Sequence, residues 1–244
     1  MKSWIAFWNI LMKDMRNYYL KPPNISWGII FPVAWTLMFL LKSPTAVDVR
    51  GLLPGVMSLS VLFGTTSMLS VTLTFERRSR SFERLLLAPI DLNLLMLAKT
   101  SGAIVFGLVN AFVPVLFAAF LTDLSGIDWL PALGAIFLIA VTSTLLGLFI
   151  AVSVKEIFEA QTFSNFFRFP MIFLCGLFIP VESLPVFLQP ISYMLPLTYG
   201  ADILKSSISQ NGHLGVPINF LILLAFAVGL FAVSVRNVKH KWIY

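Results

Sequence analysis

Two long stretches of this chain, residues 51–74 and 100–121, contain no charged side chain. A helix needs roughly 20 mostly apolar residues to cross about 30 Å of hydrocarbon, so each stretch is long enough for one crossing. The chain of 244 residues is 58% hydrophobic and only 11% charged, whereas a soluble globular protein carries roughly 25% charged residues. The sequence therefore predicts an all-α integral membrane protein.

Hydropathy along the chain predicts six membrane-spanning helices. The predicted spans are about 24–41, 51–74, 100–121, 129–154, 161–179 and 216–235. We find no internal repeat, no low-complexity tract and no linker long enough to separate domains. The expected organisation is a single transmembrane domain over residues 1–244.

The basic residues predict how these spans are oriented. Six spans place both ends of the chain on one side of the membrane, and all 17 basic residues except Lys42, Arg50 and Lys205 then fall on that side. Because lysine and arginine accumulate in cytoplasmic loops, we expect both termini in the cytoplasm. The beginning of the chain reads neither as a cleaved signal nor as a transit peptide, which favours a multi-pass protein of a prokaryotic plasma (inner) membrane.

Two further segments have patterns of their own. In residues 4–20, aromatic and apolar residues recur at helical spacing and polar residues occupy much of the other side. This pattern predicts an amphipathic helix in the inner membrane interface. In residues 180–205, prolines recur every five or six residues and obstruct one long helix. We expect short external re-entrant helices there, before the last span.

The densest charge cluster lies in the predicted cytoplasmic loop between the second and third spans, in FERRSRSFERLLLAPIDL, residues 75–92. Apolar residues at helical spacing predict a short helix, closed by Pro89. One interpretation is a basic loop that fixes topology and binds anionic lipid headgroups. Glu76 and Glu83 would weaken that attraction, so the stretch also fits a helix whose protruding aromatic residue, Phe82, docks into a soluble partner.

The same stretch resembles the cytoplasmic segment of ABC-2 type permeases, the membrane subunits of ABC exporters related to drug-resistance and nodulation-factor export proteins. The family pattern has an acidic–basic start, a Gly-Thr pair, Glu-Arg-Leu-Leu, and then a proline and a lysine. The matching residues are Glu76, Arg77, Glu83, Arg84, Leu85, Leu86, Pro89 and Lys99. Arg80 and Ser81 stand in place of the Gly-Thr pair, which predicts a turn that is more helical than in typical members.

A second resemblance lies in residues 175–205, which are similar to the family's late motif of a glycine, an aromatic residue and a proline, then Leu-Pro, and finally Pro-Leu-Thr-Tyr. The matching residues are Gly176, Phe178, Pro180, Leu184, Pro185, Pro196, Leu197, Thr198 and Tyr199. Both motifs occur in order and at the expected spans, so the resemblance covers nearly the whole chain.

The resemblance implies a coupling helix around residues 79–87, seated in a cleft of a separate ATP-binding subunit. Its candidate contact residues are Glu76, Arg77, Arg80, Phe82, Glu83, Arg84 and Leu85. The chain has no G-x-x-x-x-G-K-[ST] phosphate loop, so we expect a transport subunit rather than an enzyme. We expect ATP and Mg²⁺ on the partner subunit, no cofactor on this chain, and a pathway between two copies of it.

Five residues are candidates for the substrate path or a gate: Asn110, Arg168, Glu182, Tyr199 and Asp202. Because a buried arginine is costly inside a membrane, Arg168 either snorkels to the inner interface or lines the path and attracts an anionic headgroup. Asn110 either forms an interhelical hydrogen bond or lines the path. Glu182 and Asp202 are either solvated at the outer surface or form a gate contact, and Tyr199 belongs to the late motif.

The scarcity of cysteine and histidine limits the chemistry. Cys175 is the single cysteine, and His213 and His240 are far apart in sequence, so we expect neither a disulfide framework nor a metal site. The predicted spans contain no acidic residue and no histidine. This argues against an intramembrane enzyme, and we predict no catalytic residue.

The resulting expectation is an export permease for a lipid-, glycan- or drug-like molecule, with membrane lipids and no nucleic acid among its other partners. An ion-related transporter or channel subunit, similar to permeases linked to sodium extrusion, is the alternative.

Overall fold

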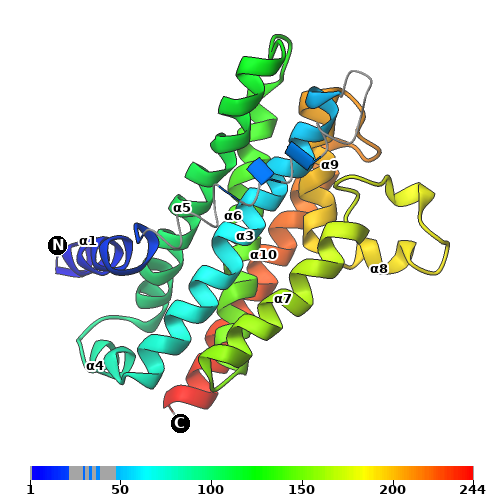
Figure 1. Ribbon diagram of the computed structural model, residues 1–244. Coiled ribbons are helices and arrows are strands. Elements are labelled where there is room, and N and C mark those ends of the chain that lie inside the picture. Colours follow the sequence, from blue (N-terminus) through cyan, green and yellow to red (C-terminus); the bar gives the residue numbers. More distant parts are fainter. Residues whose placement is uncertain (1, 22–29, 31–32, 35–36, 39–47, 244) are drawn as a thin grey trace.

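The computed structural model describes residues 2–21, 30, 33–34, 37–38 and 48–243. In these residues the regular structure is helical throughout, as the sequence predicts, and the long helices lie side by side in one bundle (Figure 1). The elements are α1 (Lys2–Asp14), η1 (Met15–Tyr19), α3 (Val49–Arg78), α4 (Ser81–Leu86), α5 (Leu92–Leu121), α6 (Trp129–Ser153), α7 (Ile157–Leu174), η2 (Val181–Ser183), α8 (Gln189–Tyr193), α9 (Pro196–Ser209), α10 (Val216–Val238) and η3 (Lys239–Ile243).

Acidic side chains cap the N-terminal ends of three of the long helices. Asp48 accepts a hydrogen bond of 2.9 Å from the backbone N–H of Gly51 at the start of α3, and Asp91 accepts one of 3.2 Å from Asn93 at the start of α5. Glu156 and Glu159 form a capping box at the start of α7. Each carboxylate satisfies an N–H group that has no partner within the helix and also complements the positive end of the helix dipole.

Four of the described helices are long and apolar enough to cross a membrane: Val49–Arg78, Leu92–Leu121, Trp129–Ser153 and Val216–Trp242. They coincide with the second, third, fourth and sixth predicted spans, although α5 begins at Leu92, well before the predicted residue 100. The predicted first span, 24–41, lies for the most part outside the described residues.

The predicted fifth span, 161–179, corresponds to α7, which is shifted toward the N-terminus and ends at Leu174. It is not among the four helices of spanning length and hydropathy in the described part of the chain. Polar residues such as Gln161, Asn165 and Arg168 interrupt its apolar sequence. The helix stops where Gly176 adopts a left-handed conformation, with φ of +72°, which glycine tolerates without steric cost.

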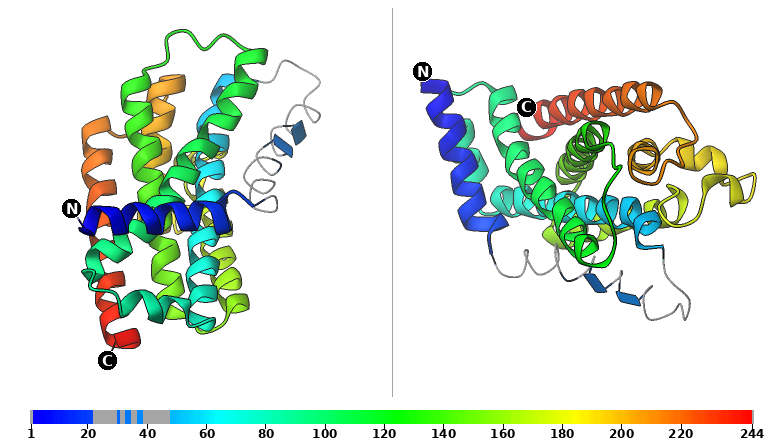
Figure 2. Two further views of the ribbon diagram at one scale, coloured as in Figure 1. Left: turned by 90° about the vertical axis from the view of Figure 1, so that its left-hand side faces the viewer. Right: turned by 90° about the horizontal axis from the view of Figure 1, so that it is seen from above.

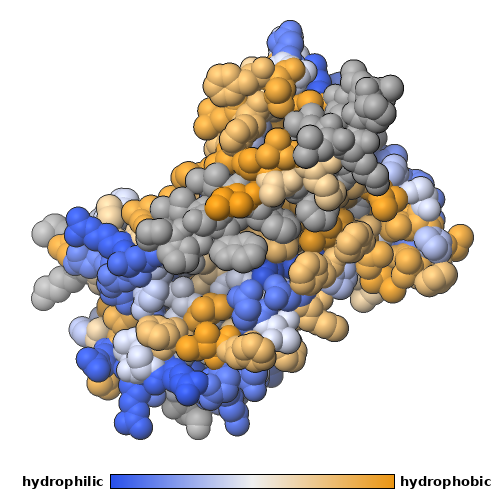
Figure 3. All heavy atoms as spheres, in the orientation of Figure 1, coloured by the Kyte–Doolittle hydropathy of each residue, from blue (hydrophilic) through white to orange (hydrophobic). Residues whose placement is uncertain are grey.

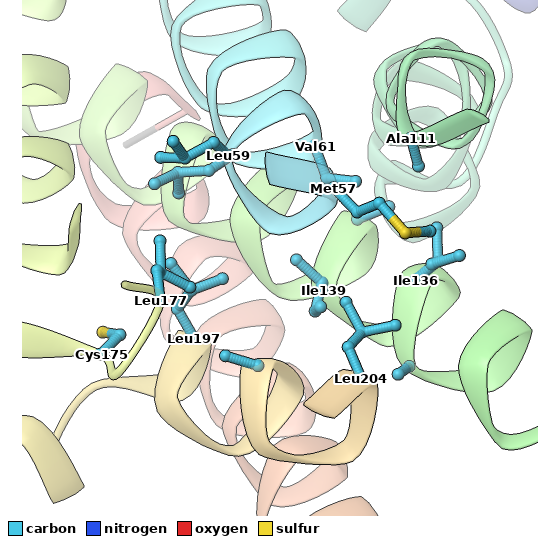
Figure 4. Packing of buried hydrophobic residues seen from close by; sticks show 14 of the residues in the cluster. Met57, Leu59, Val61, Ala111, Ile136, Ile139, Cys175, Leu177, Leu197 and Leu204 are labelled. Carbon is cyan, nitrogen blue, oxygen red and sulfur yellow. The ribbon is translucent and has the colours of Figure 1, made fainter. Parts of the chain in front are cut away.

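The bundle has two apolar cores. We call the end formed by residues 76–90, 154–156 and 239–243 the α4 end, and the opposite end, with residues 122–128 and 210–215, the far end. One core extends from the far end to Val154 and joins α3, α5, α6, α7, α9, α10 and the segment after α7; some of its residues are drawn in Figure 4. The other, which we call the core at the α4 end, joins α1, η1, α3, α4, α5, α6 and α10.

Small residues let the two central helices approach closely. A Cβ atom on Gly147 of α6 would lie 2.5 Å from the backbone oxygen of Thr66 in α3, and the Thr66 hydroxyl donates a hydrogen bond of 3.2 Å to the backbone oxygen of Ser143. Small and hydroxyl-bearing residues are typical of helix contacts inside membranes, where tight packing replaces the hydrophobic effect.

The helix α1 lies across the bundle, in the half toward the α4 end, instead of running along it (Figure 2). Its exposed face carries Trp4 and Trp8, and Trp4 stacks on Phe7 with ring centroids 5.5 Å apart. The predicted helix over 4–20 is thus present, as α1 followed by η1. On the face drawn in Figure 3, hydrophilic residues gather around α1 and the α4 end, and hydrophobic residues prevail between there and the tip of the far end.

Candidate coupling interface and buried charges

The charged stretch folds as the last turn of α3, a tight turn and the short helix α4. The hydroxyls of Ser79 and Ser81 each donate a hydrogen bond of 3.1 Å to the backbone oxygen of Glu76, which closes the end of α3. Arg80 between them has φ of +56° and lies in the left-handed region. The prediction of a more helical turn is therefore wrong: the turn keeps a conformation that suits glycine, with arginine in that position.

We expect Arg80→Gly to raise the stability of the permease, because a non-glycine residue in the left-handed conformation costs roughly 1–2 kcal/mol. The measurement is the midpoint of thermal unfolding of the purified protein in detergent. Arg78→Gly is the control, because Arg78 lies in the last helical turn of α3, where glycine costs about 1 kcal/mol relative to alanine. If both variants lost stability equally, the left-handed conformation of Arg80 would not be a source of strain.

Phe82 does not protrude, contrary to the sequence-based prediction. Its side chain is 1% exposed and meets the ring of Trp242 edge to face, with ring centroids 4.9 Å apart. The exposed apolar residue at the end of α4 is Leu87, with 86% of its surface accessible. The inward turn of Phe82 has a physical cause, because the buried ring completes the core at the α4 end.

The remaining predicted coupling residues divide between an exposed and an inward side. Arg80, Glu83 and Arg84 are exposed and Leu85 is half-buried. Arg77 is half-buried and faces inward: it donates a hydrogen bond of 3.3 Å to the backbone oxygen of Val154. Among the exposed residues of this segment, Arg80, Glu83, Arg84 and Leu87 lie on α4 or directly beside it, and we call these four the α4 face.

Glu76, also predicted to contact a partner, is instead buried in an ion cluster with residues from two other helices. Lys99 of α5, 1% exposed, forms an ion pair with Glu76 and another with Asp14 at 2.9 Å. Lys13 reaches Glu76 at 2.7 Å. Two cations and two carboxylates thus join the end of α1, the end of α3 and the start of α5.

Burial and charge act against each other in this cluster. Burial raises the pKa of the Asp14 carboxyl above its ordinary value, although the positive charge of Lys99 opposes the change. Burial lowers the pKa of Lys13, but the hydrogen bond to Glu76 and the nearby carboxylates outweigh it, so its pKa lies above the ordinary value. Lys13 therefore keeps its charge, and the ion pairs of the cluster hold α1 against the bundle.

Arg168 lies inside the bundle and does not snorkel to an interface. It is 3% exposed, donates hydrogen bonds to the backbone oxygen of Ser164 at 3.3 Å and to the Asn165 side chain, and lies over the Phe63 ring, 4.3 Å from its centroid. In the described residues it has no ion pair with a carboxylate. A positive charge is therefore held between α7 and α3.

Asn110 lies on the buried side of α5, against α3. A Cβ atom on Gly64 would lie 2.7 Å from its Nδ2 atom, and this Nδ2 has no hydrogen-bond partner in the part of the chain that the structure describes. This atom therefore gives no support to an interhelical hydrogen bond. Asn110 and Arg168 contact consecutive residues of α3, Gly64 and Phe63.

Of the other three candidates, Glu182 and Asp202 line a cavity of about 200 Å³ near the far end, and Tyr199 follows Thr198, another residue that lines it. Asp202 is buried and accepts hydrogen bonds from the backbone N–H groups of His213 and Leu214, both at 2.9 Å, and from the Asn219 side chain at 2.7 Å. It is therefore not simply solvated.

The other two members of this group have local partners. Glu182, at the rim of the cavity, is 3.4 Å from Nδ1 of His213, and both side chains are half exposed. The Tyr199 hydroxyl donates a hydrogen bond of 2.7 Å to the backbone oxygen of Tyr193. Together with Asp202, these contacts connect η2, α8, α9 and the loop before α10.

Sequence reasoning missed two structural partners, Asp14 and Trp242. Glu76 and Lys99 both belong to the first motif described above. Their ion pair inside the protein is a physical reason for an acid and a lysine at these two positions. Asp14 and Trp242 lie outside that motif, and no local periodicity indicates that they contact its residues. No group of histidine, cysteine and acidic residues that could hold a metal ion occurs among the described residues.

Four described helices of membrane-spanning length, together with an exposed charged helix at one end, fit the membrane subunit of a transport system. Residues 5–208 match the family model described as ABC-2 type transporter. The match covers most of the chain, and the chain belongs to this family. It is a permease subunit, without catalytic function of its own, of the kind that pairs with an ATP-binding subunit.

Curated relatives agree with this assignment. The chain is similar to the inner membrane transport permease YadH of Escherichia coli strain K12, with 21% identity over 94% of this chain and 93% of YadH. It is also similar to nodulation protein J of Sinorhizobium fredii, with 26% identity over 74% of this chain and 71% of that protein. A third relative is the probable multidrug ABC transporter permease YbhS of E. coli strain K12, with 24% identity over 82% of this chain and 54% of YbhS.

Proposed function

We propose that this permease forms the translocation pathway of an exporter as a dimer, driven by a separate ATP-binding subunit that docks on the α4 face. The observation that carries this proposal is the exposure of Leu87 among Arg80, Glu83 and Arg84. A bare leucine surrounded by charges is costly in water and suits a socket in a folded partner. ATP and Mg²⁺ would be bound by that partner, since this chain has no phosphate loop.

The position of the α4 face supports a mechanical role. The helix α4 follows α3 after a turn of two residues, and α3 packs extensively on both α5 and α6. A push on α4 would therefore be transmitted to the centre of the bundle. A lipid-binding loop needs no such connection, and its acidic Glu83 would oppose anionic headgroups.

The proposed arrangement in the membrane has six spans in one domain over residues 1–244, with residues 24–41 and α7 as the first and fifth. Both termini would be cytoplasmic, in a prokaryotic plasma membrane, with α1 in the inner interface. The clustering of basic residues supports this orientation, and so does the inner membrane location in the name of YadH. The short helices α8 and α9 would be re-entrant from the outer side.

For the pathway, we propose that α7 faces the second copy of the chain. Its outward side is lined by exposed phenylalanines, Phe158, Phe163, Phe166, Phe169 and Phe173, and the buried charge of Arg168 lies on its other side. A cargo with apolar bulk and an anionic group, whether lipid-, glycan- or drug-like, fits these features. The multidrug and nodulation names of two relatives agree with such a range.

The test is co-purification of the ATP-binding subunit with tagged permease from its native membrane in mild detergent. We expect an ATP-hydrolysing subunit to accompany the unmodified permease and to be lost with Leu87→Asp, because the added charge would be buried without a partner in the docking socket. Arg84→Glu should weaken the association and make it more sensitive to salt.

The matched control is Asn211→Asp, which adds the same charge to an exposed residue in the far-end loop. It should retain the ATP-binding subunit in full. Equal recovery with Leu87→Asp and with Asn211→Asp would rule out docking on the α4 face. Absence of any ATP-hydrolysing subunit from the unmodified permease would remove the basis of the exporter proposal.

A further inference from the structure

The ring of Trp242, in the turn η3 that follows α10, lies between two parts of the charged stretch. It meets the Phe82 ring of α4 with centroids 4.9 Å apart and planes at 80°, and the Arg77 guanidinium carbon lies 4.9 Å from the centroid of its ring. Edge-to-face rings and a stacked guanidinium are attractive contacts with defined geometry. They attach α4 to α10, although the two are far apart in sequence.

The attachment is buried and continues into α10. Phe82, Val235 and Val238 belong to the core at the α4 end, and Trp242 packs against it. The indole Nε1 is buried without a hydrogen-bond partner in the described residues. Apolar packing and the cation–π contact therefore hold the indole, and a phenylalanine could replace it without losing a hydrogen bond.

Toward its other end, α10 contacts Asp202, which lines the far-end cavity, and Tyr199. Its Asn219 donates a hydrogen bond of 2.7 Å to Asp202, and its Phe226 lies 6.2 Å from Tyr199, measured between ring centroids. The helix of 23 residues is about 34 Å long at 1.5 Å per residue. One continuous helix thus connects Trp242 at the α4 end with two of the candidate gate residues.

We propose that Trp242 is a positioning residue that ties α4 to α10, so that displacement of α4 by ATP reaches the far-end cavity through α10 as well as through α3. The inference rests on the proposed docking of an ATP-binding subunit on the α4 face. The route consists of packed rings at one end, a single helix in the middle and a buried hydrogen bond at the other.

The experiment reports on the far end directly. In the assembled complex, with Cys175 replaced by alanine, cysteine is introduced at Leu214, beside the cavity, or at Val49, the first residue of α3. The rate of modification by a water-soluble maleimide is measured in nanodiscs, without nucleotide and with ATP and orthovanadate. In the parent complex we expect ATP to change the rate at both positions.

Trp242→Ala should reduce the ATP-dependent change at Leu214→Cys, because only the route through α3 remains, and retain the change at Val49→Cys, together with ATP hydrolysis and recovery of the ATP-binding subunit. Trp242→Phe should restore the change at Leu214→Cys, because the ring contacts are kept. An unchanged response at Leu214→Cys in Trp242→Ala would overturn the inference. Loss of the ATP-binding subunit from that variant would overturn it as well, because Trp242 would then be needed for assembly of the complex.

Failure of the underlying proposal would look different. If ATP alters neither cysteine in the parent complex, then docking on the α4 face does not drive this chain at all, and the role of Trp242 as a positioning residue fails with it. A response at Val49→Cys alone in the parent would leave the exporter proposal standing and refute the route through α10.

Discussion

Replacing Lys99 with methionine is expected to reduce the free energy of unfolding by about 3–5 kcal/mol, because the substitution leaves Asp14 and Glu76 buried with only Lys13 to balance them. Methionine fills similar space, so the loss comes from charge and not from a cavity. The measurement is the unfolding transition of the purified permease in detergent, followed by circular dichroism.

Two comparisons separate this effect from nonspecific damage. Lys155→Met removes an exposed lysine at the same end of the bundle, and its effect should lie within about 0.5 kcal/mol of zero. The double variant Lys99→Met/Asp14→Leu removes one charge of each sign and leaves the pair of Lys13 and Glu76, so it should recover part of the loss. Wild-type stability in Lys99→Met would show that the cluster is not buried as described.

Asp202→Ala is expected to have the second large effect. The carboxylate accepts three hydrogen bonds, from the backbone of His213 and Leu214 and from Asn219, and each buried donor left without an acceptor costs about 1–3 kcal/mol. Because such costs are not additive, we expect a total loss of at least about 2 kcal/mol. Hydrogen exchange should show faster exchange of the amide protons in the loop at residues 213–214.

The control for this prediction is Glu182→Gln at the rim of the same cavity. Its contact with His213 is half exposed, and exposed ion pairs contribute at most about 1 kcal/mol. The variant should exchange like the parent at residues 213–214. If Asp202→Ala left that exchange unchanged as well, the loop would be held by other contacts and Asp202 would not be its anchor.

The parts of the fold that the sequence predicts are those that depend on composition within one segment. The charge-free stretch 51–74 could be assigned to a span because an apolar run of that length has few alternatives, and it forms most of α3. The short helix around residue 82 and the crossing helix near the N-terminus follow from helical periodicity. The helix α7 is less predictable, because its Arg168 is buried and its Asn165 is half-buried among neighbouring helices.

The direction of side chains on α4 could not be predicted from the charged stretch alone. Phe82 and Leu87 are both apolar residues on a short helix, and either could protrude. What turns Phe82 inward is Trp242, a contact that no local pattern contains. In the same way, the burial of Glu76 depends on Lys99 and on the crossing position of α1. Long-range partners decide which charged residues face outward.

The ion cluster also constrains the order in which the chain can assemble during synthesis. Asp14 and Lys99 are separated by 85 positions, which a ribosome adding about 5–20 residues per second needs roughly 4–17 s to make. Until Lys99 emerges, neither Asp14 nor Glu76 has this counter-ion, so α1 cannot take its final place across the bundle. The N-terminal helix, although translated first, is therefore completed only when α5 has entered the membrane.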